Sequence, residues 1–260
     1  MNSRNISLTL HWDELKRKEQ YPLIANKGYG IEIVSFAHYS IWENNYNSIV
    51  RKYKNELHNY TNNLISLHGP INEIIPHSEV STISRFSKQR VEKSINIALE
   101  LNAKRIVFHT GINTIITDPS YINNAVLKQA IFWSSLCSKY TNIDIVIENM
   151  WEPTTFYLVE ICKKVNKPNF GICLDIGRVN VYSEDSSENW IKLSQPFLKH
   201  IHLNDNNGNW DEHLALGNGN IDFTNWIKGL NVIPNLQYVI ELTETEDILF
   251  SLQKLESITQ

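Results

Sequence analysis

Short apolar segments alternate with longer segments of helical pattern along the whole chain, and this alternation restricts the fold more than any other feature. The apolar segments, rich in Ile, Leu, Val and Phe, are expected to form strands at residues 6–10, 30–36, 64–68, 105–109, 144–148, 170–175, 200–204 and 238–242. The intervening segments are expected to form helices at residues 12–26, 46–62, 84–102, 123–140, 155–165, 187–197, 223–230 and 247–255. Strands that alternate with helices predict a parallel sheet, because each helix carries the chain back to the start of the next strand.

Eight such strands within 260 residues match an α/β fold, the (β/α)8 or TIM barrel, which needs about 250 residues. The alternative is a doubly wound open sheet. That fold usually carries a glycine-rich phosphate-binding turn after its first strand, and here the first strand is followed by HWDELK. The sequence shows no internal repeat and no low-complexity tract. We therefore predict a single TIM-barrel domain over residues 1–260.

Composition and charge indicate where the protein is located and which classes of partner it can bind. The formal net charge of −4 offers no general attraction to nucleic acid or to an anionic membrane, although it leaves room for a local basic patch. No stretch approaches the roughly 20 apolar residues of a membrane span, and the first residues do not resemble a signal peptide. Cys137, Cys162 and Cys173 lack CxxC spacing and are expected to be free thiols. We expect a cytoplasmic protein without a membrane or nucleic-acid partner.

Consecutive predicted strands end in side chains that can bind metal. From the third strand to the eighth these are His68, His109, Glu148, Asp175, His202 and Glu241. In a barrel the carboxyl ends of all strands meet at one mouth, and several carboxylates buried there need a compensating cation. Oxygen and nitrogen ligands from neighbouring strands suit zinc, manganese, iron or cobalt. The sequence therefore predicts a divalent-metal site formed by Glu148, Asp175, His202 and Glu241.

The tracts LHG, FHTG, IEN, LDIG, HIHLND, WDEHLALGNGNIDF and IEL occur in an order and spacing that resemble the xylose-isomerase-like TIM-barrel superfamily. That superfamily includes sugar isomerases, sugar epimerases, inosose-processing enzymes and the endonuclease IV group of DNA-repair enzymes. The resemblance extends from the second predicted strand to the eighth. Its most specific part is the pattern DxHxxxGxGxIDF at residues 211–223.

The resemblance to the epimerase-type members implies one metal ion, held by the residues that match Glu148, Asp175, His202 and Glu241. The two glutamates would act as an acid/base pair, with proton transfer through a metal-stabilised enediolate. His68 and His109 would then bind substrate hydroxyls. The ion would be manganese, zinc, cobalt or iron, and the residues leave room for a second one.

The endonuclease IV-type members bind three zinc ions instead. Their pattern would make His68 and His109 ligands of one ion, and would place Asp211 and His213 at the third together with a histidine at position 178. This chain has Arg178 there, in LDIGR. Because arginine stays protonated, it cannot replace an imidazole as a ligand. Additional metal binding by His68, His109, Asp211 and His213 stays open, and Asp211 and His213 could instead order their loop.

Several other residues are candidates for substrate contact. Arg178 can hold an anionic or polyhydroxylated group by a bidentate contact, and the alternative is a salt bridge to Asp211, Glu212 or Glu184. Trp151 can stack on a sugar face. Glu32 either contacts the substrate or pairs with a residue of a neighbouring strand. His200 is expected to be a hydrogen-bonded core histidine rather than a ligand.

We therefore expect a metal-dependent isomerase or epimerase that acts on a small-molecule sugar, sugar phosphate or polyol. One alternative is an endonuclease IV-like phosphodiesterase that acts at apurinic sites. The others are a metal-dependent dehydratase or lyase on the same scaffold and a non-catalytic binding protein. A homo-oligomer is compatible with a barrel of this kind.

Overall fold

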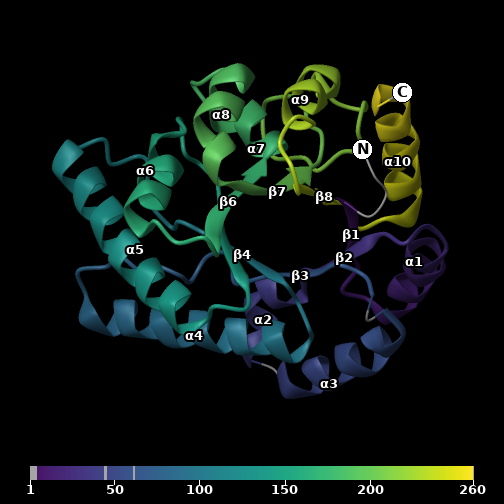
Figure 1. Cartoon of the computed structure of the whole chain (residues 1–260), viewed down its shortest axis with the longest axis horizontal. Coiled ribbons are helices and arrows are strands. Elements are labelled where there is room, and N and C mark those ends of the chain that lie inside the picture. Colours follow the sequence, from purple (N-terminus) through teal and green to yellow (C-terminus); the bar gives the residue numbers. More distant parts are fainter. Residues whose placement is uncertain (1–4, 44–45, 61, 260) are drawn as a thin grey trace.

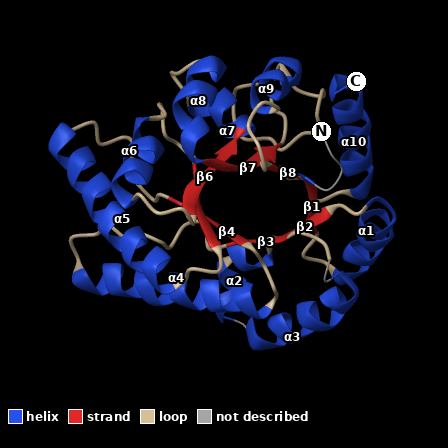
Figure 2. Ribbon diagram, in the orientation of Figure 1, coloured by secondary structure: helices blue, strands red, loops and turns tan. Residues whose placement is uncertain are grey.

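The computed structural model describes residues 5–43, 46–60 and 62–259. Within these residues eight parallel strands close into a barrel, each bonded to the next and β8 to β1 (Figures 1 and 2). The strands are β1 Ile6–Leu10, β2 Gly30–Ile33, β3 Ile65–His68, β4 Arg105–His109, β5 Asp144–Glu148, β6 Phe170–Asp175, β7 Leu198–Leu203 and β8 Gln237–Ile240. The predicted (β/α)8 TIM barrel is confirmed.

Helices surround the barrel on its outside (Figure 2). They are α1 Glu14–Lys27, α2 Tyr39–Glu43, α3 Tyr46–Glu56, α4 Ser81–Glu100, α5 Pro119–Lys139, α6 Phe156–Val165, α7 Ile176–Tyr182, α8 Ser187–Ser194, α9 Phe223–Leu230 and α10 Thr245–Thr259. Short 3-10 turns lie at Ser35–Ala37, Leu57–Tyr60 and Gln195–Phe197. None of the helices described is both long enough and apolar enough to cross a membrane.

Local sequence signals set many of these boundaries. The Asp13 carboxylate accepts hydrogen bonds from the Leu15 and Lys16 amides and starts α1, which ends at Gly28 in the left-handed conformation (φ 70°). The predicted strand 30–36 is shorter because a 3-10 turn begins at Ser35. The predicted helix 46–62 gives way to a 3-10 turn after Glu56, and its position 61 lies outside the described residues.

The hydrophobic core lies between the strands and the helices. Side chains alternate across each strand, and those facing the helices are buried and aliphatic, such as Leu8, Ile31, Leu67, Ile106, Ile145, Ile172, Ile201 and Ile240. The inside of the barrel is unusual because much of it is polar, whereas branched aliphatic residues normally fill it. Glu32 of β2 contacts His200 of β7 across this interior. The barrel therefore carries a buried polar column directly beneath its mouth.

Candidate metal centre

The strands deliver the predicted ligands to one place at the barrel mouth. His68, His109, Glu148 and Asp175 are the last residues of β3, β4, β5 and β6. His202 lies one residue before the end of β7, opposite Asp175 in the register, and Glu241 directly follows β8. All of these side chains are buried except that of Glu241, which is slightly exposed. Strand geometry alone therefore assembles a cluster of imidazoles and carboxylates.

Glu148 is the centre of this cluster. Its Oε1 lies 2.7 Å from Nδ1 of His202, and its Oε2 lies 3.1 Å from Nε2 of His68 and 3.2 Å from Nε2 of His109. Burial acts to raise the pKa of Glu148, but Arg178 and His202 outweigh it and hold the pKa well below its ordinary value. Glu148 is thus an ionised carboxylate that contacts His202 with one oxygen and His68 and His109 with the other.

The two histidines on one side of Glu148 are suited to metal binding in different ways. Nδ1 of His68 lies 2.8 Å from the Gly69 carbonyl oxygen, so it donates there and directs Nε2 towards Glu148. Neither ring nitrogen of His109 forms a hydrogen bond within the described chain, although the ring is buried and its Nε2 lies 3.2 Å from Glu148 Oε2. Burial lowers the pKa of His109 well below its ordinary value, which favours the neutral ring. A buried neutral imidazole whose nitrogens form no hydrogen bond is suited to bind a metal ion.

His202 faces the cluster with Nδ1, which lies 3.4 Å from Glu241 Oε2 in addition to its contact with Glu148. Its other nitrogen, Nε2, lies 2.9 Å from Glu32 Oε1. Burial acts to lower the pKa of His202, but Cys173 and the surrounding carboxylates raise it well above its ordinary value. Without a metal ion His202 therefore carries a proton that an ion would displace.

Asp175 is held differently from the other carboxylates. Its side chain caps α7 by accepting a hydrogen bond from the Arg178 amide at 2.9 Å. It also accepts a hydrogen bond from Asn204 Nδ2 at 3.3 Å. Asn204 Nδ2 also lies 3.2 Å from Glu241 Oε2, so this amide links two carboxylates. Burial raises the pKa of Asp175 to about 7, against the opposing charge of Arg178. Sequence reasoning did not single out Asn204, because an asparagine after a strand looks like an ordinary turn residue.

Arg178 lies among the carboxylates of the mouth. Its Nη1 is 2.7 Å from Glu148 Oε1, and its Nε is 3.2 Å from Asp211 Oδ2 and 3.6 Å from Asp175 Oδ2. The predicted alternative of a salt bridge to Asp211 is confirmed, whereas Glu212 accepts from the Asn207 amide instead. The guanidinium therefore supplies a fixed positive charge beside Glu148.

Asp211 and His213 lie at the edge of the cluster, in the loop after β7. His213 Nε2 is 3.2 Å from Asp211 Oδ2, and its Nδ1 is 3.1 Å from the Glu241 carbonyl oxygen. Burial acts to lower the pKa of His213, but Glu241 and Asp211 raise it to about 10. Asp205 shapes the glycine-rich part of the same loop, because its carboxylate accepts the amides of Gly217 and Gly219. Sequence reasoning missed this role of Asp205.

A suitable donor set for a divalent ion is present. One ligand atom from each of His68, Glu148, His202 and Glu241 lies within 4.8 Å of all the others. The predicted ligand set had Asp175 in place of His68. The structure groups His68 with the other three because Asp175 is directed to the start of α7, Arg178 and Asn204. Two imidazoles and two carboxylates suit zinc, manganese, cobalt or iron, so the residues fit the expected cofactor.

The remaining candidates lie above and below the cluster. Trp151 follows β5 at the mouth and is 49% exposed. Glu32 is fully buried beneath the cluster, where it accepts from Ser66 of the neighbouring strand β3, as the pairing alternative predicted, and also contacts His200 and His202 of β7 across the barrel. The prediction that His200 is a hydrogen-bonded core residue is confirmed.

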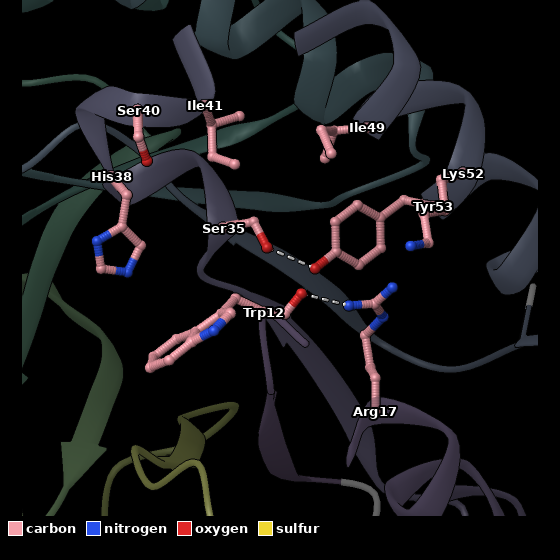
Figure 3. A pocket seen from close by; sticks show the side chains of 9 residues that line it. All are labelled: Trp12, Arg17, Ser35, His38, Ser40, Ile41, Ile49, Lys52 and Tyr53. Carbon is pink, nitrogen blue, oxygen red and sulfur yellow. Dashed lines mark hydrogen bonds between the residues drawn. The ribbon is translucent and has the colours of Figure 1, made fainter. Parts of the chain in front are cut away.

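A cavity of about 320 Å³ opens beside the carboxyl ends of β1 and β2 (Figure 3). Trp12 and His38 lie on one side of it, with their rings 6.0 Å apart and nearly perpendicular. Ile41 and Ile49 supply apolar walls, and Tyr53 contributes a hydroxyl that pairs with Ser35. Ser35, Ser40, Arg17 and Lys52 also line the cavity, so it combines aromatic and apolar walls with polar and basic groups, on the same face of the barrel as the cluster.

Together these features define a TIM-barrel protein with a candidate divalent-metal centre at the carboxyl ends of its strands. The family described as xylose isomerase-like TIM barrel matches residues 25–255. The chain belongs to this family.

An uncharacterised protein of Methanocaldococcus jannaschii is 29% identical over 196 residues, which cover 74% of this chain and 76% of that protein. The crystal structure of a D-tagatose 3-epimerase-like protein has a TM-score of 0.78 at 24% identity and covers 98% of this chain and 96% of its own. The TTHB071 protein from Thermus thermophilus, from a crystal soaked with zinc chloride, has a TM-score of 0.77 at 21% identity and covers 98% of this chain and 97% of its own. At these sequence identities the two solved structures show only that the fold is shared.

Proposed function

We propose that the protein is a divalent-metal-dependent sugar or sugar-phosphate isomerase or epimerase. The observation that carries the proposal is the group of His68, Glu148, His202 and Glu241, whose ligand atoms converge at the mouth of the barrel. Membership of the xylose isomerase-like family and the likeness to a D-tagatose 3-epimerase-like structure support it.

Glu148, His202 and Glu241 would hold the ion, since they belong both to the predicted ligand set and to the group that the structure brings together. His68 lies next to them, and Asp175 is joined to Glu241 through Asn204. A single ion of manganese, zinc, cobalt or iron is proposed, with His68, His109 and Glu148 Oε2 as donors for a second. When bound, such an ion would supply Lewis-acid polarisation of a carbonyl and stabilisation of enediolate charge.

The two glutamates would carry the proton transfers. Glu148 ends β5 and Glu241 follows β8, so their carboxylates enter the mouth from different strands. One would remove the proton next to the carbonyl, and the other would deliver a proton to the opposite face. Arg178 and His202 hold Glu148 in its ionised form, which is the form a base requires.

The rest of the substrate would contact residues around the mouth. We place the end remote from the reacting carbons in the cavity beside β1 and β2, where Trp12 is 59% exposed (Figure 3). Trp151 supplies a second exposed indole that can cover a sugar face. Arg178 would complete the polar wall next to Glu148. A small-molecule sugar or polyol fits this combination of aromatic surfaces and a polar centre.

A panel of ketoses and ketose phosphates in deuterated water, with manganese, cobalt or zinc, tests the proposal. The wild-type protein should incorporate deuterium and form a stereoisomer or positional isomer of one substrate. Glu148→Gln and Glu241→Gln should each lower that exchange at least 100-fold, because each removes a proton-transferring group. Glu152→Gln is a matched control, since Glu152 is buried near the mouth but pairs with Thr110.

Two outcomes would overturn the proposal. Undiminished exchange in both glutamate variants would remove the glutamates from the reaction. Release of water without a change of configuration would instead assign the protein to the dehydratases.

A further inference from the structure

The imidazole of His202 is held between two competing carboxylates. Glu148 Oε1 lies 2.7 Å from its Nδ1, and Glu32 Oε1 lies 2.9 Å from its Nε2. All three side chains have no exposed surface. A neutral imidazole carries only one N–H, so the carboxylate that receives it decides which nitrogen keeps a lone pair.

Only one of these arrangements permits a metal ion. Nδ1 points to Glu148 and Glu241, where the ligand atoms converge, so Nδ1 must carry the lone pair. The proton must then lie on Nε2, which requires an acceptor beneath the ring. Within the described part of the chain neither Glu32 Oε1 nor His202 Nε2 forms a hydrogen bond, and the two atoms lie 2.9 Å apart, so each is available to pair with the other. Without Glu32 the proton would move to Nδ1 and bind Glu148, which blocks the site.

Glu32 is itself fixed in place. Its second oxygen, Oε2, accepts from the Ser66 hydroxyl at 2.7 Å and lies 2.9 Å from His200 Nε2. Nδ1 of His200 faces Arg105 Nη1 at 3.5 Å, and this neighbour leaves His200 to donate from Nε2 to Glu32. Contacts from β3 and β7 therefore orient the Glu32 carboxylate, and its Oε1 is directed to His202.

We propose that Glu32 is a positioning residue for the metal centre: it fixes the Nε2–H form of His202 and so presents Nδ1 to the ion. The proposal rests on the metal site of the proposed function, and it does not depend on which substrate is turned over. Carboxylates that accept from ligand histidines commonly change metal affinity by 10-fold to 100-fold when they are removed.

The test measures zinc binding to the intact chain by competition with a chromophoric chelator. Glu32→Gln should weaken zinc binding 10-fold to 100-fold, because a side-chain amide offers a weaker acceptor and a competing donor. Glu32→Asp, which keeps the charge, should restore part of this loss. His200→Gln should change the affinity less than threefold, because the glutamine amide can still donate to Glu32 Oε2 and the pair of Glu32 and His202 stays in place. Glu152→Gln should bind like the wild type.

A second measurement covers the case in which Glu32→Gln does not fold. Long-range ¹⁵N–¹H spectra of the zinc-loaded wild-type protein should show His202 protonated at Nε2 and metal-bound at Nδ1. The opposite assignment, or a folded Glu32→Gln protein that binds zinc within threefold of the wild type, would overturn the proposal. Zinc binding that depends on Glu32 in a protein without isomerase activity would refute only the proposed function.

Discussion

Nη1 of Arg178 lies 2.7 Å from Oε1 of Glu148, and both side chains are buried at the barrel mouth. The guanidinium therefore contacts the same oxygen that faces Nδ1 of His202. Buried carboxylates need compensating charge, and in the absence of an ion Arg178 supplies part of it. Arg178 and a divalent cation thus compete for the same negative charges.

Removing the charge of Arg178 should tighten zinc binding. Arg178→Gln should lower the dissociation constant for zinc about tenfold at pH 7.5, since like charges a few ångströms apart repel strongly in a buried site. The metal-free variant should also melt at a lower temperature than the metal-free wild type, because its carboxylates lose their partner. Competition titrations and thermal melts measure the two effects, with Arg178→Lys as the control that keeps the charge. Weaker zinc binding by Arg178→Gln would contradict the competition.

Replacing Arg178 by histidine should add a metal ion. Arg178 Nε and His213 Nε2 both lie 3.2 Å from Asp211 Oδ2, so an imidazole at position 178 would face a carboxylate and a second histidine. Two imidazoles and a carboxylate can hold zinc. Elemental analysis after saturation with zinc should find one more ion per chain in Arg178→His than in the wild type. Arg178→Gln should show no such increase, and an equal count in all three proteins would refute the expectation.

Gly177 should be intolerant of a side chain. A Cβ at this position would collide with Oδ1 of Asn204, whose amide nitrogen binds Asp175 and Glu241. Gly177→Ala should destabilise the protein by about 1–3 kcal/mol, as overpacking commonly does, and should weaken zinc binding. Urea unfolding measures the first effect. In an Asn204→Ala background the same change should cost much less, and equal costs in both backgrounds would show that the collision is not the cause.

Acid should destabilise the protein partly through His77, which lies outside the metal centre. Burial lowers the pKa of His77 from 6.5 to about 4, so the unfolded chain takes up a proton that the folded chain excludes. Its contribution to stability is complete above pH 6.5 and is lost as the pH falls towards 4. When the pH is lowered from 6.5 to 4, the free energy of unfolding should fall less in His77→Gln than in the wild type, as measured by urea titrations at each pH. His58→Gln, at an exposed histidine, should follow the wild-type profile.

The barrel and the strand ends at which the candidate site residues lie could be predicted because each depends on a local pattern. Strands at residues 105–109, 144–148 and 170–175 have the predicted bounds, since each is a short apolar run that ends in a charged or imidazole side chain. α7 was not predicted. Its seven residues follow Asp175 at once, and the sequence there contains Gly, Asn and two valines rather than a helical pattern.

The arrangement within the site could not be predicted from such patterns. The ligand atoms of His68 lie with those of Glu148, His202 and Glu241 in the candidate group, whereas Asp175 caps the helix that the sequence did not reveal. Glu32 and His202 are far apart in the chain, and their contact depends on the curvature of the closed barrel. Asn204 acts through the direction of its amide, which residue type does not specify.

The ligand-type side chains stand on strands or directly beside them, whereas Trp12, His38 and Trp151 stand on the connections that follow β1, β2 and β5. The strands are hydrogen-bonded to one another around the whole barrel, whereas each connection joins only the two elements that precede and follow it. Insertions or exchanges in these connections can therefore reshape the entrance while the reactive groups keep their spacing. In such a scaffold a new substrate preference is expected to arise by loop replacement, with the chemistry inherited unchanged.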